Sequence, residues 1–312
     1  MKPEETRGLW LGLLGVVLFA ATLPMTKLAT GSAAEPALSP AFVTFGRAAV
    51  AGLLSVLYLL WKRGALPRGR QWGALAFTAC GIVVGFPLFM AMGLRHLESI
   101  HASVVTGILP LATAVVASVW LRQRPSVGFW MCAVAGSLLV VCFMVLRSGA
   151  PGSSAQWADL LLVLAVLSAA LGYVSGGQLS AQLGAERVIC WVLVISLPLT
   201  VPVAALNWPL LPVTPAAWGG FAYLALFSMW LGFFAWYRAL ALGGTVRVSQ
   251  VQLLQPFLSM LMSVPLLGET LDMLSVGFAL AVIATVFLGK RMPVGASAPP
   301  TQPNQSAPKG VV

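Results

Sequence analysis

Fifty consecutive residues, from Val188 to Tyr237, contain no Asp, Glu, Lys or Arg. A soluble domain has about 25% charged residues, whereas this chain has 8% charged and 59% hydrophobic residues. A membrane-spanning helix needs about 20 mostly apolar residues, so the uncharged run is too long for one span. The segment 207–215 contains three prolines and supplies the break between two spans. The sequence therefore predicts an integral membrane protein.

Apolar runs of spanning length occur along most of the chain and predict ten transmembrane helices. The predicted spans are residues 8–27, 41–61, 72–94, 101–121, 126–146, 157–178, 188–207, 216–239, 247–267 and 271–289. Lys and Arg fall between these runs, so the net charge of +10 indicates cytoplasmic loops rather than a surface for nucleic acid. With a cytoplasmic N-terminus, the cytoplasmic segments hold 14 of these cations and the opposite side holds Lys27, Arg95 and Arg147. Both termini are therefore predicted to be cytoplasmic.

One motif occurs twice, at an offset of 146 residues. The matched positions are Leu94 with Leu240, Ser103 with Ser249, Val105 with Val251, Pro110 with Pro256, and Leu121 with Leu267. If each half holds five spans, the second half is inverted relative to the first, as in many secondary transporters. We therefore predict an all-α fold of two inverted five-helix repeats, residues 1–150 and 151–290. The Pro-rich tail, residues 291–312, is predicted to be disordered.

Polar side chains line one face of the fourth span and one face of the ninth. Across the repeats, Thr106 matches Gln252, Pro110 matches Pro256 and Thr113 matches Ser259, while Gln255 adds an amide nearby. In lipid such a face must contact protein or water, so it either lines a solute pathway or joins helices. Its recurrence around a proline favours the pathway, and each proline is expected to kink its helix.

Arg47 is the charged residue that lies well inside a predicted span, about 9 Å from its start at about 1.5 Å per residue. It is expected either to pair with a substrate carboxylate or to reach the interface and cap carbonyl groups. Aromatic residues of the third and eighth spans, among them Phe86, Trp236 and Tyr237, either wall a cavity for a partly apolar solute or face lipid.

Acidic residues are expected only at or near the ends of spans: Glu98, Asp159, Glu269 and Asp272. His96 and His101 fall in one turn outside the membrane and are expected to be solvated. Proton coupling could then use only groups near span ends, such as Asp159 or Glu269, and facilitated diffusion is the favoured alternative. The cysteines lack metal-ligand spacing, and neither a metal nor a cofactor is expected.

These residues resemble a known family. The chain resembles the EamA-type branch of the drug/metabolite transporter superfamily. The resemblance is carried by Arg47 shortly after Leu38-Ser39-Pro40, by Pro110 and Pro256, and by the ending Leu267-Gly268-Glu269. The resemblance covers roughly residues 8–290, although the first half reads Leu121-Arg122-Gln123 where the second has Leu-Gly-Glu. It implies an exporter of amino acids or other small metabolites in a bacterial inner membrane, commonly linked to protons.

The sequence thus predicts a secondary transporter that works by alternating access, with a small solute and membrane lipid as its partners. A passive channel or a non-transporting membrane protein is the alternative. An enzyme is disfavoured because the spans offer no mid-membrane Asp, Glu or His as a base. Monomer and homodimer both remain open.

Overall fold

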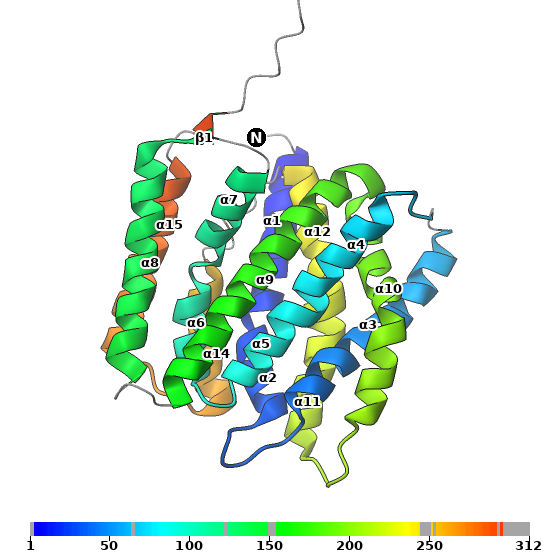
Figure 1. The fold of residues 1–312 in the computed structure, drawn as a ribbon, viewed down its shortest axis with the longest axis horizontal. Coiled ribbons are helices and arrows are strands. Elements are labelled where there is room, and N and C mark those ends of the chain that lie inside the picture. The colour runs from blue at the N-terminus through cyan, green and yellow to red at the C-terminus, as the bar shows by residue number, and fades with distance from the viewer. Residues whose placement is uncertain are drawn as a thin grey trace, which may run out of the picture.

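The computed structural model describes residues 3–63, 66–120, 124–148, 154–243, 251, 254–291 and 294–295. These residues form an all-helical bundle, apart from two antiparallel two-residue strands, β1 (Arg124–Pro125) and β2 (Val294–Gly295). The helices run roughly side by side along one direction of the molecule (Figure 1). The tail beyond residue 295, predicted to be disordered, lies outside the described residues, as do Gln252 and the segment 121–123.

In the first half of the chain, several of the predicted spans are divided into two or three helical segments. Its elements are α1 (Pro3–Ala20), α2 (Thr22–Thr30), α3 (Pro40–Trp61), α4 (Gln71–Ala79), η1 (Cys80–Gly85), α5 (Phe86–Gly93), α6 (Ser99–Thr106), α7 (Leu109–Trp120) and α8 (Val127–Ser148). The second half follows the same plan with α9 (Ser154–Leu183), α10 (Ala185–Leu206), α11 (Pro215–Tyr223), η2 (Leu224–Leu231), α12 (Gly232–Gly243), α14 (Gln255–Leu267) and α15 (Met273–Arg291).

Prolines account for the breaks within spans, since a proline has no N–H to donate to the carbonyl four residues earlier. Pro24 leaves the carbonyl of Ala20 without that bond, and α1 ends at Ala20. Pro110 likewise cannot bond the carbonyl of Thr106, where α6 ends. Pro110 is the second residue of α7 and Pro256 the second residue of α14. The matched prolines therefore each begin a helical segment.

The third and eighth spans contain π-helical turns at matching positions. Adding the offset of 146 to the bounds of η1 gives 226–231, which falls within η2. Turns of this kind are rare and are frequently found at functional sites. Two glycines let η1 approach α9 closely: a Cβ on Gly81 would lie 2.6 Å from the carbonyl oxygen of Ser168, and one on Gly172 would lie 2.5 Å from Ile82. Both therefore need glycine to keep this packing.

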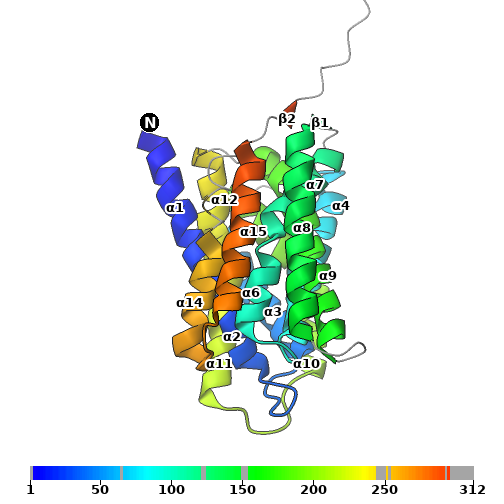
Figure 2. The ribbon, with the colours of Figure 1, turned by 90° about the vertical axis from the view of Figure 1, so that its left-hand side faces the viewer.

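Contacts between the halves follow a reciprocal pattern. The predicted second span packs on the predicted seventh (α3 on α10), the predicted fourth on the predicted ninth (α6 on α14) and the predicted fifth on the predicted tenth (α8 on α15). The predicted first span packs on the predicted eighth, because α1 contacts α12. The predicted sixth span is α9, and it contacts all three elements of the predicted third span, α4, η1 and α5. Figure 2 shows α8 and α15 side by side on the face of the bundle turned toward the viewer. If each span is replaced by its counterpart in the other half, the first by the sixth and so on, the same set of pairings results.

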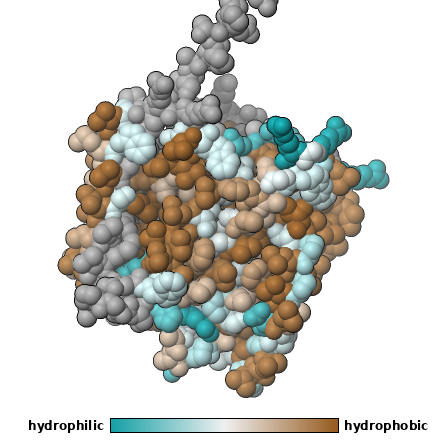
Figure 3. Space-filling model, viewed as in Figure 1, coloured by the Kyte–Doolittle hydropathy of each residue, from teal (hydrophilic) through white to brown (hydrophobic). Residues whose placement is uncertain are grey.

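Seven helical segments of the described chain are long and apolar enough to cross a membrane: Thr6–Thr30, Pro40–Trp61, Gln71–Gly93, Ser99–Trp120, Trp157–Ser180, Ala185–Leu206 and Pro215–Ala239. Three shorter apolar helices are Trp130–Leu139, Phe257–Leu267 and Met273–Thr285. Large apolar side chains are exposed on the outside, including Leu57, Leu60 and Leu206. Figure 3 shows brown hydrophobic residues over the middle of one face, with teal hydrophilic residues toward its ends. Such a surface suits lipid.

Candidate functional site

A small cavity of about 30 Å³ lies between the two halves of the chain. Its polar lining comes from Thr22 of α2, Arg47 of α3, Thr106 of α6, Tyr173 of α9, Ser228 of η2 and Gln255 of α14. Its apolar lining includes Phe19, Phe86 and Phe233. Because both π-helical segments contribute to the wall through Ile82 and Ser228, the irregular turns of the fold border the cavity.

Arg47 brings a positive charge into this cavity. The hydroxyl of Ser39 caps α3 by accepting from the N–H of Phe42 at 3.0 Å, and Arg47 follows two turns later. Its side chain is only 3% exposed, and Nε is buried without a hydrogen-bond partner. In the part of the chain that the structure describes, no carboxylate forms an ion pair with this guanidinium. A buried cation without a counter-charge is costly, so Arg47 is suited to hold an anionic group.

Two further polar features of the wall concern Gln255 and the contact between Thr22 and Ser228. The amide oxygen of Gln255 is buried without a partner, so it can accept a hydrogen bond from a solute. The hydroxyl oxygens of Thr22 and Ser228 lie 2.8 Å apart and join α2 to η2 across the halves. Thr106 donates instead to the carbonyl of Ala102 in its own helix, at 2.9 Å. The cavity therefore combines one cation, one free acceptor and several hydroxyl groups with aromatic walls.

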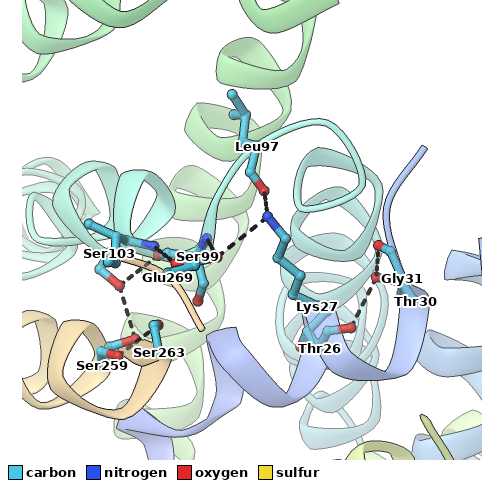
Figure 4. A network of polar contacts seen from close by, with 11 residues as sticks. Thr26, Lys27, Thr30, Gly31, Leu97, Ser99, Ser103, Ser259, Ser263 and Glu269 are labelled. Carbon is cyan, nitrogen blue, oxygen red and sulfur yellow. Dashed lines mark hydrogen bonds and ion pairs between the residues drawn. The ribbon is translucent and has the colours of Figure 1, made fainter. Parts of the chain in front are cut away.

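A polar network around Glu269 joins α2, the start of α6 and the turn before α15 (Figure 4). The carboxylate of Glu269 accepts from the backbone N–H groups of Ser99 at 2.8 Å and Ile100 at 3.0 Å. Lys27 places Nζ 3.4 Å from the same carboxylate and donates to the carbonyl of Leu97 at 2.7 Å. Glu269 thus caps α6 from the other half of the chain, where an anion suits the helix dipole.

A second contact in Figure 4 joins α6 to α14 one turn deeper. The hydroxyl of Ser103 donates to Oγ of Ser259 at 3.0 Å, and both side chains are buried. Ser263 donates back to the carbonyl of Ser259 at 2.9 Å. The polar faces predicted on these two spans therefore meet at this level.

His101 does not lie in solvent as the sequence suggests, and this expectation was wrong. Its Nε2 lies 2.6 Å from Oδ1 of Asp159, with side-chain exposures of 5% and 6%. The ring of Phe143 packs against the imidazole with centroids 4.8 Å apart. His96, in the preceding turn, is exposed as expected. The reason is that α6 begins at Ser99, so His101 lies inside the helix on the side that meets α9.

The structure brings together only some of the residues that the sequence singles out. Arg47, Phe86, Thr106 and Gln255 line the cavity, whereas Ser259 and Glu269 lie outside its described lining and contact α6. Trp236 and Tyr237 belong to the buried core around α1 and α12 and are not among the lining residues described for the cavity. Thr113 is half-buried on α7 and is likewise outside that lining.

Among the residues of these sites, sequence reasoning did not anticipate Phe19, Lys27 and Ser228, and it placed His101 in solvent. Ser228 carries a hydroxyl group within an otherwise apolar run, between Phe227 and Met229. A single polar side chain in such a run indicates that it faces protein rather than lipid. His101 is flanked by Ile100 and Ala102, which favours a buried helix over an exposed turn. The described residues contain no group of three His, Cys, Asp or Glu placed to hold a metal ion.

Comparison with known proteins gives consistent matches along the chain. The model of the EamA-like transporter family matches residues 6–146 and again residues 156–289. The "Uncharacterized transporter YdeK" of Bacillus subtilis (strain 168) is 39% identical over 296 residues, which cover 92% of this chain and 98% of that protein. A second protein of that organism, "Uncharacterized transporter YyaM", is 25% identical over 82% of this chain and 85% of its own length.

A solved structure named "Crystal structure of protein" is similar in fold. Its TM-score to this chain is 0.62 at 17% sequence identity, and the match covers 91% of this chain and 96% of the other. At this identity the likeness concerns the arrangement of the helices alone.

Proposed function

Because the chain belongs to the EamA-like transporter family, we propose that it is a secondary transporter that exports a small anionic metabolite by alternating access. The solute class we propose is an amino acid or another small metabolite with a carboxylate group. It occupies the cavity between the two halves, with its carboxylate on Arg47 and its apolar part against Phe19, Phe86 and Phe233.

The observation that carries this proposal is the buried guanidinium of Arg47. A cation at the centre of a membrane helix costs about 3 kcal/mol on insertion scales, and described side chains supply no carboxylate to offset that cost. A solute carboxylate would neutralise the charge, and its two oxygens could accept parallel hydrogen bonds from the planar guanidinium. The free oxygen of Gln255 would accept from an amino or hydroxyl group of the same solute.

We further propose that all ten predicted spans cross the membrane as two inverted five-helix repeats, over residues 1–150 and 151–290. The reciprocal pairing of spans supports this arrangement, as does the match of π-helical turns in the third and eighth spans. In such repeats the substrate site lies near the midplane, and one half rocks against the other. The network around Glu269 then closes one side of the membrane.

The 14-to-3 distribution of Lys and Arg supports cytoplasmic termini in a bacterial inner membrane. The network around Glu269 includes Lys27 of α2, and α2 lies toward the end of the bundle opposite the N-terminus (Figure 2), so the network would close the outer side. We expect reporter fusions after residue 292 and within residues 147–156 to report opposite sides of the membrane. Fusions that report the same side would contradict both the orientation and the count of ten spans.

The experiment that tests the function is a secretion screen. Cells that overproduce the protein are compared with cells that carry the empty vector, and metabolites in the medium are measured by mass spectrometry. We expect enrichment of small carboxylates that have an apolar portion. Enrichment confined to cationic solutes would contradict the role of Arg47, because a like charge would meet the guanidinium in the cavity.

A further inference from the structure

We propose that the solute of the cavity is a 2-hydroxy acid with an apolar side chain, and that the corresponding amino acids are excluded by their ammonium group. This inference rests on the proposed transport function and narrows the solute class of the same cavity. Three features carry it: the buried cation of Arg47, the free amide oxygen of Gln255, and the placement of all acidic residues of the chain away from the cavity.

The carboxylates of the chain lie elsewhere. The sequence has eight acidic residues, and none of them is in the described lining of the cavity. Six are exposed or have partners outside the cavity: Glu35 and Glu98 are exposed, Asp159 contacts His101, Glu186 pairs with Arg238, Glu269 pairs with Lys27, and Asp272 accepts from the N–H of Ser275. The other two, Glu4 and Glu5, lie at the start of α1, at least about 21 Å along the helix from Phe19 of the cavity wall. The cation in the cavity therefore has no anionic partner from the protein.

The solute must then balance the charge of Arg47 by itself. The cavity measures about 30 Å³, and one water molecule needs at least about 10–15 Å³, so a solute enclosed between the halves keeps few water molecules. A monocarboxylate beside Arg47 gives a pair without net charge. An amino acid carries no net charge, so its complex keeps one uncompensated positive charge away from water. Burying an uncompensated charge is strongly unfavourable.

Repulsion between two cations sets the size of the effect. When the carboxylate of an α-amino acid contacts Arg47, covalent geometry places the ammonium nitrogen about 6 Å from the guanidinium carbon. With an effective dielectric constant of about 20, like charges at this separation lower the affinity roughly a hundredfold. The aromatic walls of the cavity, Phe19, Phe86 and Phe233, can attract an ammonium group, but such contacts restore only part of the hydration that it loses. We therefore expect a preference of roughly a hundredfold for the hydroxy acid.

Gln255 adds a requirement for a hydrogen-bond donor beside the carboxylate. Its amide oxygen is buried without a partner, and Gln255 lines the same small cavity as Arg47. That oxygen accepts but cannot donate, so a hydroxyl or an ammonium group satisfies it, whereas a keto group or a methylene group does not. The hydroxyl groups of Thr22 and Ser228 are bonded to each other, and that of Thr106 donates within its own helix. Since charge excludes the ammonium group, a hydroxyl group next to the carboxylate is the partner that fits.

The test is exchange of matched solutes by the full chain in proteoliposomes. The matched pairs are lactate with alanine, 2-hydroxy-4-methylpentanoate with leucine, and 3-phenyllactate with phenylalanine. Within each pair the carbon skeleton is the same, so the pair isolates the change from hydroxyl to ammonium, and the series covers a range of sizes. Vesicles are loaded with one unlabelled compound, and the entry of a labelled trace of that compound is measured. In the pair of the best-fitting size, we expect the hydroxy acid to exchange roughly a hundredfold faster than the amino acid.

Two variants assign the preference to its residues. R47Q removes the charge, so the ratio between hydroxy acid and amino acid should fall toward one. Q255L removes the acceptor, so it should abolish the preference of about tenfold that we expect the wild type to show for the hydroxy acid over the same acid without its hydroxyl group. Q255L should keep the preference over the amino acid. R68Q removes an exposed cation and should keep both ratios.

The ratios of the wild type decide the inference even if a variant fails to fold. An amino acid that exchanges as fast as its hydroxy acid would overturn the inference and leave the proposed carboxylate transport in place. Exchange of other carboxylates from the secretion screen, without exchange of any hydroxy acid, would do the same. A protein that exchanges no carboxylate at all would refute the transport proposal and this inference with it. A hundredfold preference that persists in folded R47Q would contradict its origin in the charge of Arg47.

Discussion

Replacement of Arg47 by glutamine is expected to lower the rate of carboxylate efflux about a hundredfold while leaving the protein at least as stable as the wild type. A charge-assisted contact between a buried guanidinium and a carboxylate is worth about 3 kcal/mol, which corresponds to roughly a hundredfold in binding. Folding should not suffer, because Nε of Arg47 has no partner to lose and no described carboxylate pairs with the side chain. Efflux from preloaded cells and thermal unfolding in detergent measure the two quantities separately.

The matched variants sharpen this expectation. R47K keeps the charge but loses the planar donor fork, so it should retain part of the efflux. R68Q removes an exposed cation at the end of the bundle that we propose to be cytoplasmic, and it should leave efflux unchanged. If R47Q exports the solute at the wild-type rate, Arg47 serves only the structure and the solute is not held by its charge.

Much of the helical framework could be predicted from the sequence, because lipid requires long apolar helices and leaves few alternatives. The break expected within the uncharged run at residues 207–215 lies between α10 and α11. The predicted first, second and third spans correspond to long apolar segments of the structure. The internal breaks were less predictable. A proline indicates that a helix is interrupted, but whether it bends or ends depends on the neighbouring helices.

The contacts of the site could not be predicted, because they join residues that are distant in the sequence. Glu269 caps an N–H group 170 residues away, and His101 meets Asp159 across 58 residues. Helical periodicity shows which residues share a face but not which helix that face will meet. For this reason the sequence places Asp159 near a span end and His101 in solvent, although together they form a buried pair.

Aromatic residues illustrate the same limit. The sequence groups Trp236 and Tyr237 with Phe86 as candidates for a cavity wall, yet only Phe86 is in the described lining, and the other two pack in the core. The helix that carries Trp236 also carries Phe233, which does line the cavity. Phe233 belongs to the same buried core cluster as Trp236 but also reaches the cavity one helical turn away, and composition alone cannot predict that difference.

A disulfide between positions 103 and 259 is expected to stop transport completely. In the wild type the two hydroxyl oxygens lie 3.0 Å apart between α6 and α14, so thiols placed there by S103C and S259C should be within reach of oxidation. A covalent bond between α6 and α14 would prevent the outer end from opening, whereas the cavity and Arg47 would stay intact. Treatment of the double variant with a mild oxidant should abolish solute exchange, and a reductant should restore it.

The two single variants are the controls for this disulfide, since each lacks one of the two thiols and should be insensitive to the oxidant. The four native cysteines, at positions 80, 132, 142 and 190, are present in all three proteins and cannot explain a difference between them. Normal exchange by the oxidised double variant, with the disulfide verified by mass spectrometry, would mean that α6 and α14 do not separate during transport.

Counterflow in proteoliposomes tests most directly the claim that one cavity is opened alternately to the two sides. Vesicles loaded with unlabelled solute are diluted into a trace of labelled solute, with equal pH on both sides. A carrier predicts that the label rises transiently above its equilibrium level, that the initial rate saturates with solute concentration, and that both features disappear when the disulfide of the S103C/S259C double variant is formed. A monotonic approach to equilibrium with a rate that never saturates would identify a channel and contradict the proposed mechanism.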